Sequence, residues 1–312
     1  MKLKKQSMIG PLSLLIAAFI WGVTFVAQDK GAAHVQAFTF QTFRSLVAVL
    51  ALSSLVFFRD LTARKRGSYR PMTQREKKFL FLGGGVCGAI LFTASGLQQF
   101  GIGNNITSPG KDAFITALYI VFVPVLGLFL KKRSAPHVYL CVVVALFGLW
   151  MLCMSGSAIT LGDIQVILCA VAFSFHIMVV DAVAPHVDAV RLSCVQFSVV
   201  ALLSLLCMLI FEHPTLAGIL AAAGAFVFAG LFSSGIAFTL QTVGQGHTPS
   251  TLASLIMSLE SVFAVAASII LLPEIPAPTL REWVGMVLIF AAIIFSQIPL
   301  KYPKRKRSIE QI

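Results

Sequence analysis

The chain has 312 residues, of which 58% are hydrophobic and only 12% are charged. About a quarter of the residues of an ordinary soluble domain are charged, so the composition excludes that class and indicates an integral membrane protein. The net charge of +12 comes from short basic clusters between apolar runs, a pattern typical of membrane topology and not of a nucleic-acid-binding surface. The six cysteines lie in apolar segments without a CxxC pair, so we expect neither disulfides nor a zinc site.

Ten apolar segments are each long enough to cross a bilayer, for which a helix needs about 20 mostly apolar residues. We predict membrane-spanning helices at about residues 10–28, 37–58, 78–99, 107–130, 137–155, 162–183, 189–211, 217–242, 249–272 and 281–299. The predicted fold class is therefore an all-α integral membrane protein with ten transmembrane helices.

The second segment contains a full charge, Arg44, with Gln41 one turn before it. A charged side chain in hydrocarbon costs several kcal/mol and marks a candidate functional position. Two interpretations of Arg44 remain open. It is either an interface anchor or partner of a backbone carbonyl, or a cation that faces a central cavity and attracts a carboxylate or phosphate of a substrate.

The fourth segment is interrupted by Pro109, Gly110, Lys111 and Pro124. Lys111 lies near the external start of the span, where it either faces water or contacts a substrate. Pro109 and Gly110 are expected to loosen the start of the helix and to act as a gate. Pro124 is expected to kink the helix and to free a carbonyl, for transport or for packing alone.

Two titratable side chains lie deep in later segments: His176 in the sixth and Glu260 in the ninth. Glu260 lies about 10 Å from the cytoplasmic end of its span, at 1.5 Å per residue. We expect it to carry a proton, to pair with Arg44 or another cation, or to cap a discontinuous helix. His176 titrates near neutral pH and is the other candidate for proton coupling, although a lone histidine in a helix commonly serves packing.

Uncharged polar and aromatic side chains fall in the same spans. Trp21 and Tyr119 are candidates for the aromatic lining of a substrate site, and Gln98, Gln196 and Gln241 are candidates for hydrogen bonds to a polar solute. The glutamines serve equally to tie helices together, at about 0.6 kcal/mol for an average intramembrane hydrogen bond.

The distribution of lysine and arginine sets the expected orientation. With ten spans both termini lie on one side, which then receives 20 of the 24 basic residues. The opposite side receives Lys30 and Arg281, while Arg44 and Lys111 belong to spans. Because basic loops stay in the cytoplasm, we expect a protein of the cell (plasma) membrane with both termini cytoplasmic and a basic tail at 301–312.

An internal repeat is visible when the chain is shifted by 152 residues, which sets Gln196 over Arg44. At this shift AAFIWGVTFVAQD (17–29) lies over CAVAFSFHIMVVD (169–181). Further along, at smaller offsets, FTASGLQQ (92–99) is set over FTLQTVGQ (238–245), Gly84 over Gly230, and VPVLG (123–127) over ESVFA (260–264). We predict two five-helix repeats, residues 1–156 and 157–300. Because five is odd, the repeats have inverted topology, an arrangement that places a substrate site between them.

Five stretches carry a likeness to a known family: WGVTFV (21–26), FQTFRSLVAVL (40–50), FITALYIVFVPVLG (114–127), TLASLIMSLESVFA (251–264) and LLPEIPAPTLREWVGMVLIFAAI (271–293). In these the chain resembles the drug/metabolite transporter superfamily, in its EamA-type branch. That family usually has Glu-Pro where this chain has Glu260-Ser261, so a helix break is less expected there. The resemblance implies an inner-membrane carrier of small metabolites, often an exporter of amino acids, without an ATPase of its own.

The predicted function is a secondary transporter that exports small polar metabolites such as amino acids by alternating access, without ATP hydrolysis. One alternative is a carrier of phosphorylated or sugar-linked solutes, favoured if Arg44 and Lys111 both face the cavity. A membrane sensor or scaffold is a further alternative, which the lack of a large loop disfavours. We expect no enzymatic activity, cofactor, metal or nucleic-acid partner. The expected partners are a small-molecule substrate and the lipid bilayer, and the sequence leaves monomer and homodimer open.

Overall fold

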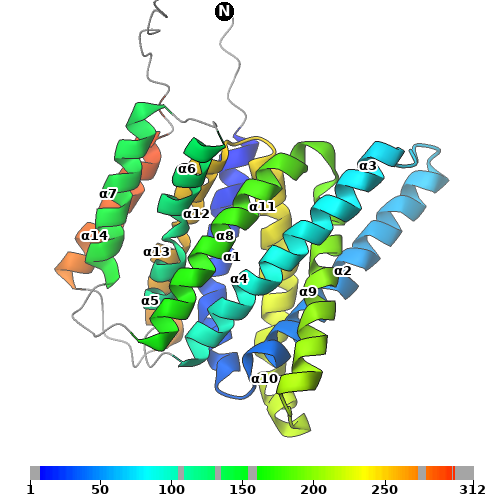
Figure 1. Cartoon of the computed structure of the whole chain (residues 1–312), viewed down its shortest axis with the longest axis horizontal. Helices are drawn as coiled ribbons and strands as arrows, with labels where there is room; N and C mark the ends of the chain where they lie inside the picture. Colours follow the sequence, from blue (N-terminus) through cyan, green and yellow to red (C-terminus); the bar gives the residue numbers. More distant parts are fainter. Residues whose placement is uncertain are drawn as a thin grey trace, which may run out of the picture.

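The computed structural model describes residues 8–104, 109–130, 135–153, 160–272, 279–296 and 298. These residues form helices joined by short connections, and they contain no β-strand. The long helices lie side by side and tilt against one another; α1 (Ile9–Ala32) begins at the same edge of the bundle at which α14 (Leu280–Ser296) ends (Figure 1). The predicted tail, 301–312, and the basic cluster 131–133 lie outside the described residues.

The remaining helices follow one another in chain order. The first half continues with α2 (Ala37–Lys65), α3 (Gln74–Lys78), a π-helical segment (Phe79–Gly83), α4 (Gly84–Asn104), α5 (Pro109–Thr116), α6 (Tyr119–Phe129) and α7 (Pro136–Cys153). The second half contains α8 (Leu161–Val183), a 3-10 turn (Ala184–His186), α9 (Ala189–Phe211), α10 (Leu216–Phe228), a π-helical segment (Ala229–Ala237), α11 (Phe238–Gln245), α12 (Ser250–Met257) and α13 (Glu260–Leu271), before α14.

Most of the predicted membrane spans coincide with long apolar helical segments. Among the described residues, eight such segments are long and apolar enough to cross a membrane. Two shorter apolar helices, Pro136–Met151 and Trp283–Ser296, lie where the sequence predicts the fifth and tenth spans. The second span is longer than predicted: α2 continues as a helix to Lys65, so part of the predicted basic hairpin is helical.

The distribution of side chains on α2 is that of a membrane protein. Gln41, Arg44 and Ser45 are at most 5% exposed, while Leu50 and Phe57 are more than 60% exposed. Apolar side chains can face lipid at no cost, whereas polar groups in hydrocarbon require partners inside the bundle. Burial of its polar face therefore turns α2 so that Arg44 points inward.

Glycines mark close helix contacts, and the carbonyl groups that they meet in the two halves are 152 residues apart. A Cβ atom added to Gly88 of α4 would lie 2.7 Å from the Gln196 carbonyl oxygen of α9. A Cβ atom added to Gly230 would lie 2.6 Å from the Arg44 carbonyl oxygen of α2. Gln196 and Arg44 are the residues that the predicted shift of 152 brings together, so the helices of the two halves are packed in corresponding ways.

A second pair of glycines behaves in the same manner. A Cβ at Gly101 would lie 3.0 Å from the carbonyl oxygen of Gly162, and one at Gly244 would lie 3.1 Å from the carbonyl oxygen of Gly10. These carbonyls are again 152 residues apart. The contacts match Gly88 with Gly230, whereas the sequence alignment set Gly84 over Gly230. The close contacts of the third and eighth segments thus correspond at an offset about one helical turn smaller than the sequence alignment used.

Two of the apolar segments are broken near their middle. The helices α5 and α12 are each eight residues long, and after two non-helical residues α6 starts at Tyr119 and α13 at Glu260. The first break falls before Pro124, which lies inside α6. The equivalent starts also match Tyr119 with Glu260, whereas the sequence alignment set Val123 over Glu260.

The break before Glu260 forms although the proline that the family usually has at position 261 is replaced by serine. Serine hydroxyls replace it: Ser254, Ser258 and Ser261 each donate a hydrogen bond to the carbonyl oxygen three residues earlier, at 2.7–2.9 Å. Such side-chain bonds compete with the helical ladder and satisfy carbonyls near a break. The expectation of a weaker break at Glu260-Ser261 was therefore wrong.

Candidate functional site

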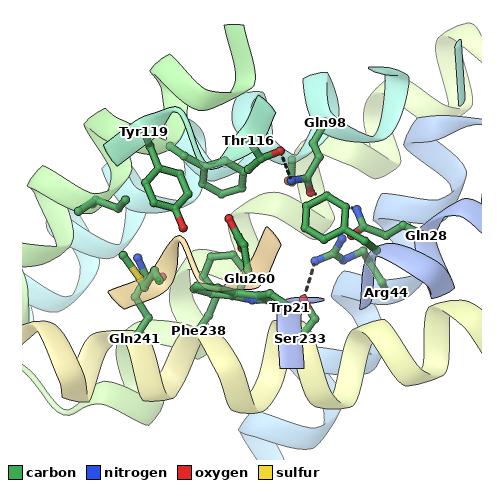
Figure 2. Close-up of a pocket in the computed structure, with 15 residues that line it drawn as sticks. Trp21, Gln28, Arg44, Gln98, Thr116, Tyr119, Ser233, Phe238, Gln241 and Glu260 are labelled. Atoms are coloured by element: carbon green, nitrogen blue, oxygen red, sulfur yellow. Dashed lines mark hydrogen bonds between the residues drawn. The ribbon is translucent and has the colours of Figure 1, made fainter. Parts of the chain in front are cut away.

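A cavity of about 40 Å³ lies between the two broken segments, α1, α2 and the second π-helical segment (Figure 2). It is lined by Trp21, Phe25, Gln28, Arg44, Ser95, Gln98, Thr116, Tyr119, Phe173, Ile177, Ser233, Phe238, Gln241, Met257 and Glu260. Both halves of the chain contribute to the lining. Six of the predicted substrate-site or coupling residues are among them, namely Trp21, Arg44, Gln98, Tyr119, Gln241 and Glu260.

Arg44 supplies the positive charge of the cavity. Its Nη2 donates a hydrogen bond to Ser233 Oγ at 3.3 Å (Figure 2). Its Nε donates another to Ser234 Oγ at 3.2 Å. Neither partner is charged, and no carboxylate of the described residues forms an ion pair with Arg44. Since a guanidinium has five N–H donors, the serines leave donors for another group. Arg44 therefore faces the cavity and is not an anchor at the membrane interface.

The widened helix around Ser233 explains how Arg44 is held. The π-helical segment Ala229–Ala237 places Ser233 and Ser234 against α2, and Gly230 lets the two backbones approach at Arg44 itself. π-Helical turns are rare and occur frequently at functional sites. The local geometry thus fixes the guanidinium without neutralising it.

Glu260 supplies the negative charge. It is the first residue of α13, where the positive end of the helix dipole stabilises a carboxylate. It is 4% exposed, and Oε1 has no hydrogen-bond partner in the part of the chain that the structure describes. Glu260 forms no ion pair with Arg44 or with another cation of the described residues. Of the roles left open by the sequence, a structural ion pair is therefore excluded within the described part of the chain.

Tyr119 lies opposite Glu260. It is the first residue of α6, just after the other helix break, and its hydroxyl points toward the Glu260 carboxyl group (Figure 2). The Tyr119 hydroxyl is buried and interacts with the Glu260 carboxyl group, and no other group of the described residues forms a hydrogen bond with it. Buried polar atoms are ordinarily paired, so this end of the cavity offers a donor and an acceptor to a bound solute.

A cluster of amides forms the wall near Arg44. Gln98 Nε2 donates to Thr116 Oγ1 at 3.2 Å (Figure 2). Gln28 Nε2 donates to Gln98 Oε1 and to Gln99 Oε1, both at 3.1 Å. Gln98 and Gln99 are thus tied to α1 and α5. The network orients the Gln98 side chain beside the cavity while connecting three helices.

Aromatic rings form the opposing wall. The rings of Trp21 and Phe238 meet edge to face with centroids 5.0 Å apart, a favourable geometry for aromatic pairs. Trp21 Nε1 and Gln241 Oε1 are buried without hydrogen-bond partners. The wall therefore combines apolar surface with two unused polar atoms.

Three other predicted residues lie behind the lining. Gln41 Nε2 donates to Ser95 Oγ at 2.9 Å and to the Phe92 carbonyl at 3.1 Å. His176 Nε2 and Gln196 Oε1 are 3.1 Å apart, and both residues are fully buried. These side chains support residues of the cavity wall and are not themselves part of the lining.

The four residues singled out in the fourth segment also lie outside the lining. Lys111 Nζ forms an ion pair with Asp163 Oδ2 at 2.9 Å, so it connects α5 to the start of α8. Pro109 and Gly110 are the first, buried residues of α5, and Pro124 is enclosed in α6. The cationic pair of Arg44 with Lys111 that would favour a phosphorylated solute is therefore not formed in the cavity.

Several residues of the lining were missed in the sequence. Gln28, Ser95, Thr116 and Ser233 are small or neutral polar residues in apolar runs, and many such residues elsewhere only tie helices together. Gln28 is the exception that had a signal, since it stands two residues before Lys30 at the end of an otherwise apolar run. The others become recognisable only once the helices are packed.

The sequence profile of the EamA-like transporter family matches residues 8–154 and, a second time, residues 160–297. The chain belongs to the EamA-like transporter family. As a member of this family the protein is a multi-pass membrane transporter and not an enzyme.

Two further proteins are similar to this chain. An uncharacterized transporter of Archaeoglobus fulgidus is 28% identical over 293 residues, which cover 91% of this chain and 84% of the relative. A protein of known crystal structure has a TM-score of 0.69 at 17% identity, over 92% of this chain and 96% of that one. The second likeness shows a shared fold alone.

Proposed function

We propose that this EamA-like protein is a secondary exporter of small polar metabolites of the amino-acid type, with the cavity around Arg44 and Glu260 as its substrate site. It works by alternating access between two inverted five-helix repeats, without ATP hydrolysis. The observation that carries the proposal is one central cavity lined by a cation and a carboxylate, neither of them in an ion pair within the described residues.

The charges suit a solute that itself carries both signs. A carboxylate accepts charge-assisted hydrogen bonds from the free donors of Arg44, and an ammonium group is complementary to Glu260. The amides near Arg44 and the rings of Trp21 and Phe238 accommodate polar and apolar parts of the solute. Because Lys111 is taken up by Asp163, a phosphorylated solute would meet only one cation, and we favour the amino-acid type.

The contacts at the two ends of the α2–α9 pair support alternating access. At the basic edge, Arg191 Nη2 lies 2.6 and 2.7 Å from the two oxygens of Asp60. At the opposite edge, Glu212 accepts hydrogen bonds from the amides of Phe38 and Thr39 at 2.8 and 2.7 Å. Asp60 and Glu212 are 152 residues apart, as are Thr39 and Arg191.

Corresponding residues thus close the same helix pair at both of its ends. Opening one end while the other stays closed is what transport from one side to the other requires, and inverted repeats supply the two equivalent closures. The basic edge is placed in the cytoplasm by the excess of lysine and arginine there. The protein is then a plasma-membrane protein with both termini inside.

The substrate proposal is tested with purified protein reconstituted in vesicles that are loaded with radiolabelled solutes. We expect counterflow of amino acids and no counterflow of sugar phosphates. Arg44→Gln should raise KM about tenfold or more, the equivalent of one charge-assisted hydrogen bond. Lys30→Gln is the control, because Lys30 is exposed near the end of α1 and does not line the cavity.

Two comparisons decide between outcomes. A carboxylate solute without an amine should remain sensitive to Arg44→Gln and become insensitive to Glu260→Gln. If no solute of any class moves, the proposed transport is wrong. If Arg44→Gln leaves the transport of every accepted solute unchanged, the cavity does not bind a carboxylate. Proton coupling through Glu260 or His176 would require that Glu260→Gln or His176→Gln alter the dependence of transport on pH.

A further inference from the structure

A second hollow lies away from the central cavity, on the outer side of the bundle. It is a groove of about 630 Å³ between α2, the π-helical segment before α4, and the start of α9. Its apolar walls are formed by Val56, Phe57, Leu61, Phe81, Cys194 and Val195. Phe57 and Phe81 are each more than 60% exposed, so the groove is open at its side.

The charged residues of the groove lie at one end of it. Asp60 and Arg191 neutralise each other through the bidentate ion pair at 2.6 and 2.7 Å. Arg64 has no carboxylate partner among the described residues. Its guanidinium carbon lies 4.3 Å from the centroid of the Tyr69 ring, which holds the side chain in place while leaving its N–H donors at the rim.

The length of the groove corresponds to one leaflet of a bilayer. Its lining on α2 runs from Ser53 to Arg64, which is roughly 17 Å at 1.5 Å per residue. Half of the hydrocarbon core of a bilayer is about 15 Å thick. An apolar channel of this length with a free arginine at its polar end has the dimensions of a lipid chain below its headgroup.

The surroundings of the rim are strongly basic. Residues 57–80 and 184–195 together contain nine lysines and arginines and only three acidic residues. A basic pocket between transmembrane helices is complementary to an anionic headgroup, and a guanidinium binds phosphate oxygens in a bidentate manner. A zwitterionic headgroup would bring a positive amine into the same field and would be disfavoured.

We propose that this groove is a binding site for an anionic phospholipid of the leaflet at the basic edge. One acyl chain lies along Val56, Phe57 and Val195, and the phosphate is bound by Arg64. The lipid then fills the space between α2 and α9 directly beside the Asp60–Arg191 ion pair, so that its binding stabilises the closed arrangement of these two helices.

The test is native mass spectrometry of the purified full chain titrated with phosphatidylglycerol or with phosphatidylcholine of the same chain length. We expect phosphatidylglycerol to bind more tightly. Arg64→Gln should weaken its binding about tenfold, as expected for one charge-assisted contact. Lys65→Gln removes the same charge from the next residue, which does not line the groove, and should have a much smaller effect.

A second pair of variants tests the acyl chain. Ser53 and Ser54 are both exposed on α2, and only Ser53 lines the groove. Ser53→Trp should reduce phosphatidylglycerol binding, and Ser54→Trp should not.

Equal binding of the two lipids, equal effects of Arg64→Gln and Lys65→Gln, or full competition by inorganic phosphate would overturn the proposal. So would a doubled mass without bound lipid, which would indicate that a second copy of the chain occupies the groove.

Discussion

Replacing Gly88 with alanine is expected to push α4 away from α9. The added Cβ would lie 2.7 Å from the Gln196 carbonyl oxygen and 2.7 Å from Val199 Cβ, whereas ordinary contact begins at 3.4 Å. The helices must therefore separate by about 0.7 Å. Neither the backbone oxygen nor a Cβ atom can rotate away, so the substitution should lower the free energy of unfolding by about 1–3 kcal/mol, the usual cost of overpacking.

Gly85→Ala provides the matched control, since it lies three residues earlier on α4 and a Cβ there would meet nothing within 4 Å. The assay is thermal unfolding of both variants in the same lipid nanodiscs, followed by tryptophan fluorescence. A loss of about 1–3 kcal/mol corresponds to a decrease in Tm of a few degrees in a chain of this size. If Gly88→Ala and Gly85→Ala had the same Tm, the inferred close packing of α4 on α9 would be refuted.

Three further predictions concern contacts at the edges of the bundle. Burial raises the pKa of Asp188, but hydrogen bonds from Arg59 and the Arg191 amide outweigh it and hold the pKa below the ordinary 3.8. Asp188→Asn should therefore lower Tm near pH 7, and its difference from wild type should vanish as pH falls through the lowered pKa; a constant difference down to pH 2 would contradict this. Lys111→Gln should lower the free energy of unfolding by about 3 kcal/mol, because it removes the ionic partner of Asp163. The KM for transport should not change, and a raised KM would show that Lys111 contributes to substrate binding. Glu212→Gln should destabilise the start of α2 by about 1 kcal/mol, measured as faster amide exchange at Phe38 and Thr39, and unchanged exchange would argue against this cap.

Much of the fold could be predicted because hydrophobic length is a local property. Each span requires about 20 apolar residues, and the described helices coincide closely with those runs. The register within a repeat was harder, since apolar residues match one another at many offsets. The contact of Gly88 with the Gln196 carbonyl indicates that register. This contact depends on how closely two helix backbones approach, which the amino-acid sequence does not show.

The residues of the polar site were likewise predicted only in part from the sequence. Arg44 and Glu260 stood out because a charge in an apolar span is costly, and both line the cavity. Lys111 stood out for the same reason but is paired with Asp163, 52 residues away in the chain. The sequence by itself contains no measure of which buried charges find partners.

The sequence alone determined that the chain is an all-helical membrane protein with charges inside its spans, because composition and run length follow directly from the cost of placing polar groups in hydrocarbon. Only the tertiary structure decided which of those charges remain without an ionic partner. Packing brings Ser233 and Ser234 to Arg44, starts α13 at Glu260, and removes Lys111 to Asp163. Arg44 and Glu260 line one cavity. Neither is in an ion pair within the described residues, because packing brings no opposite charge close enough to them.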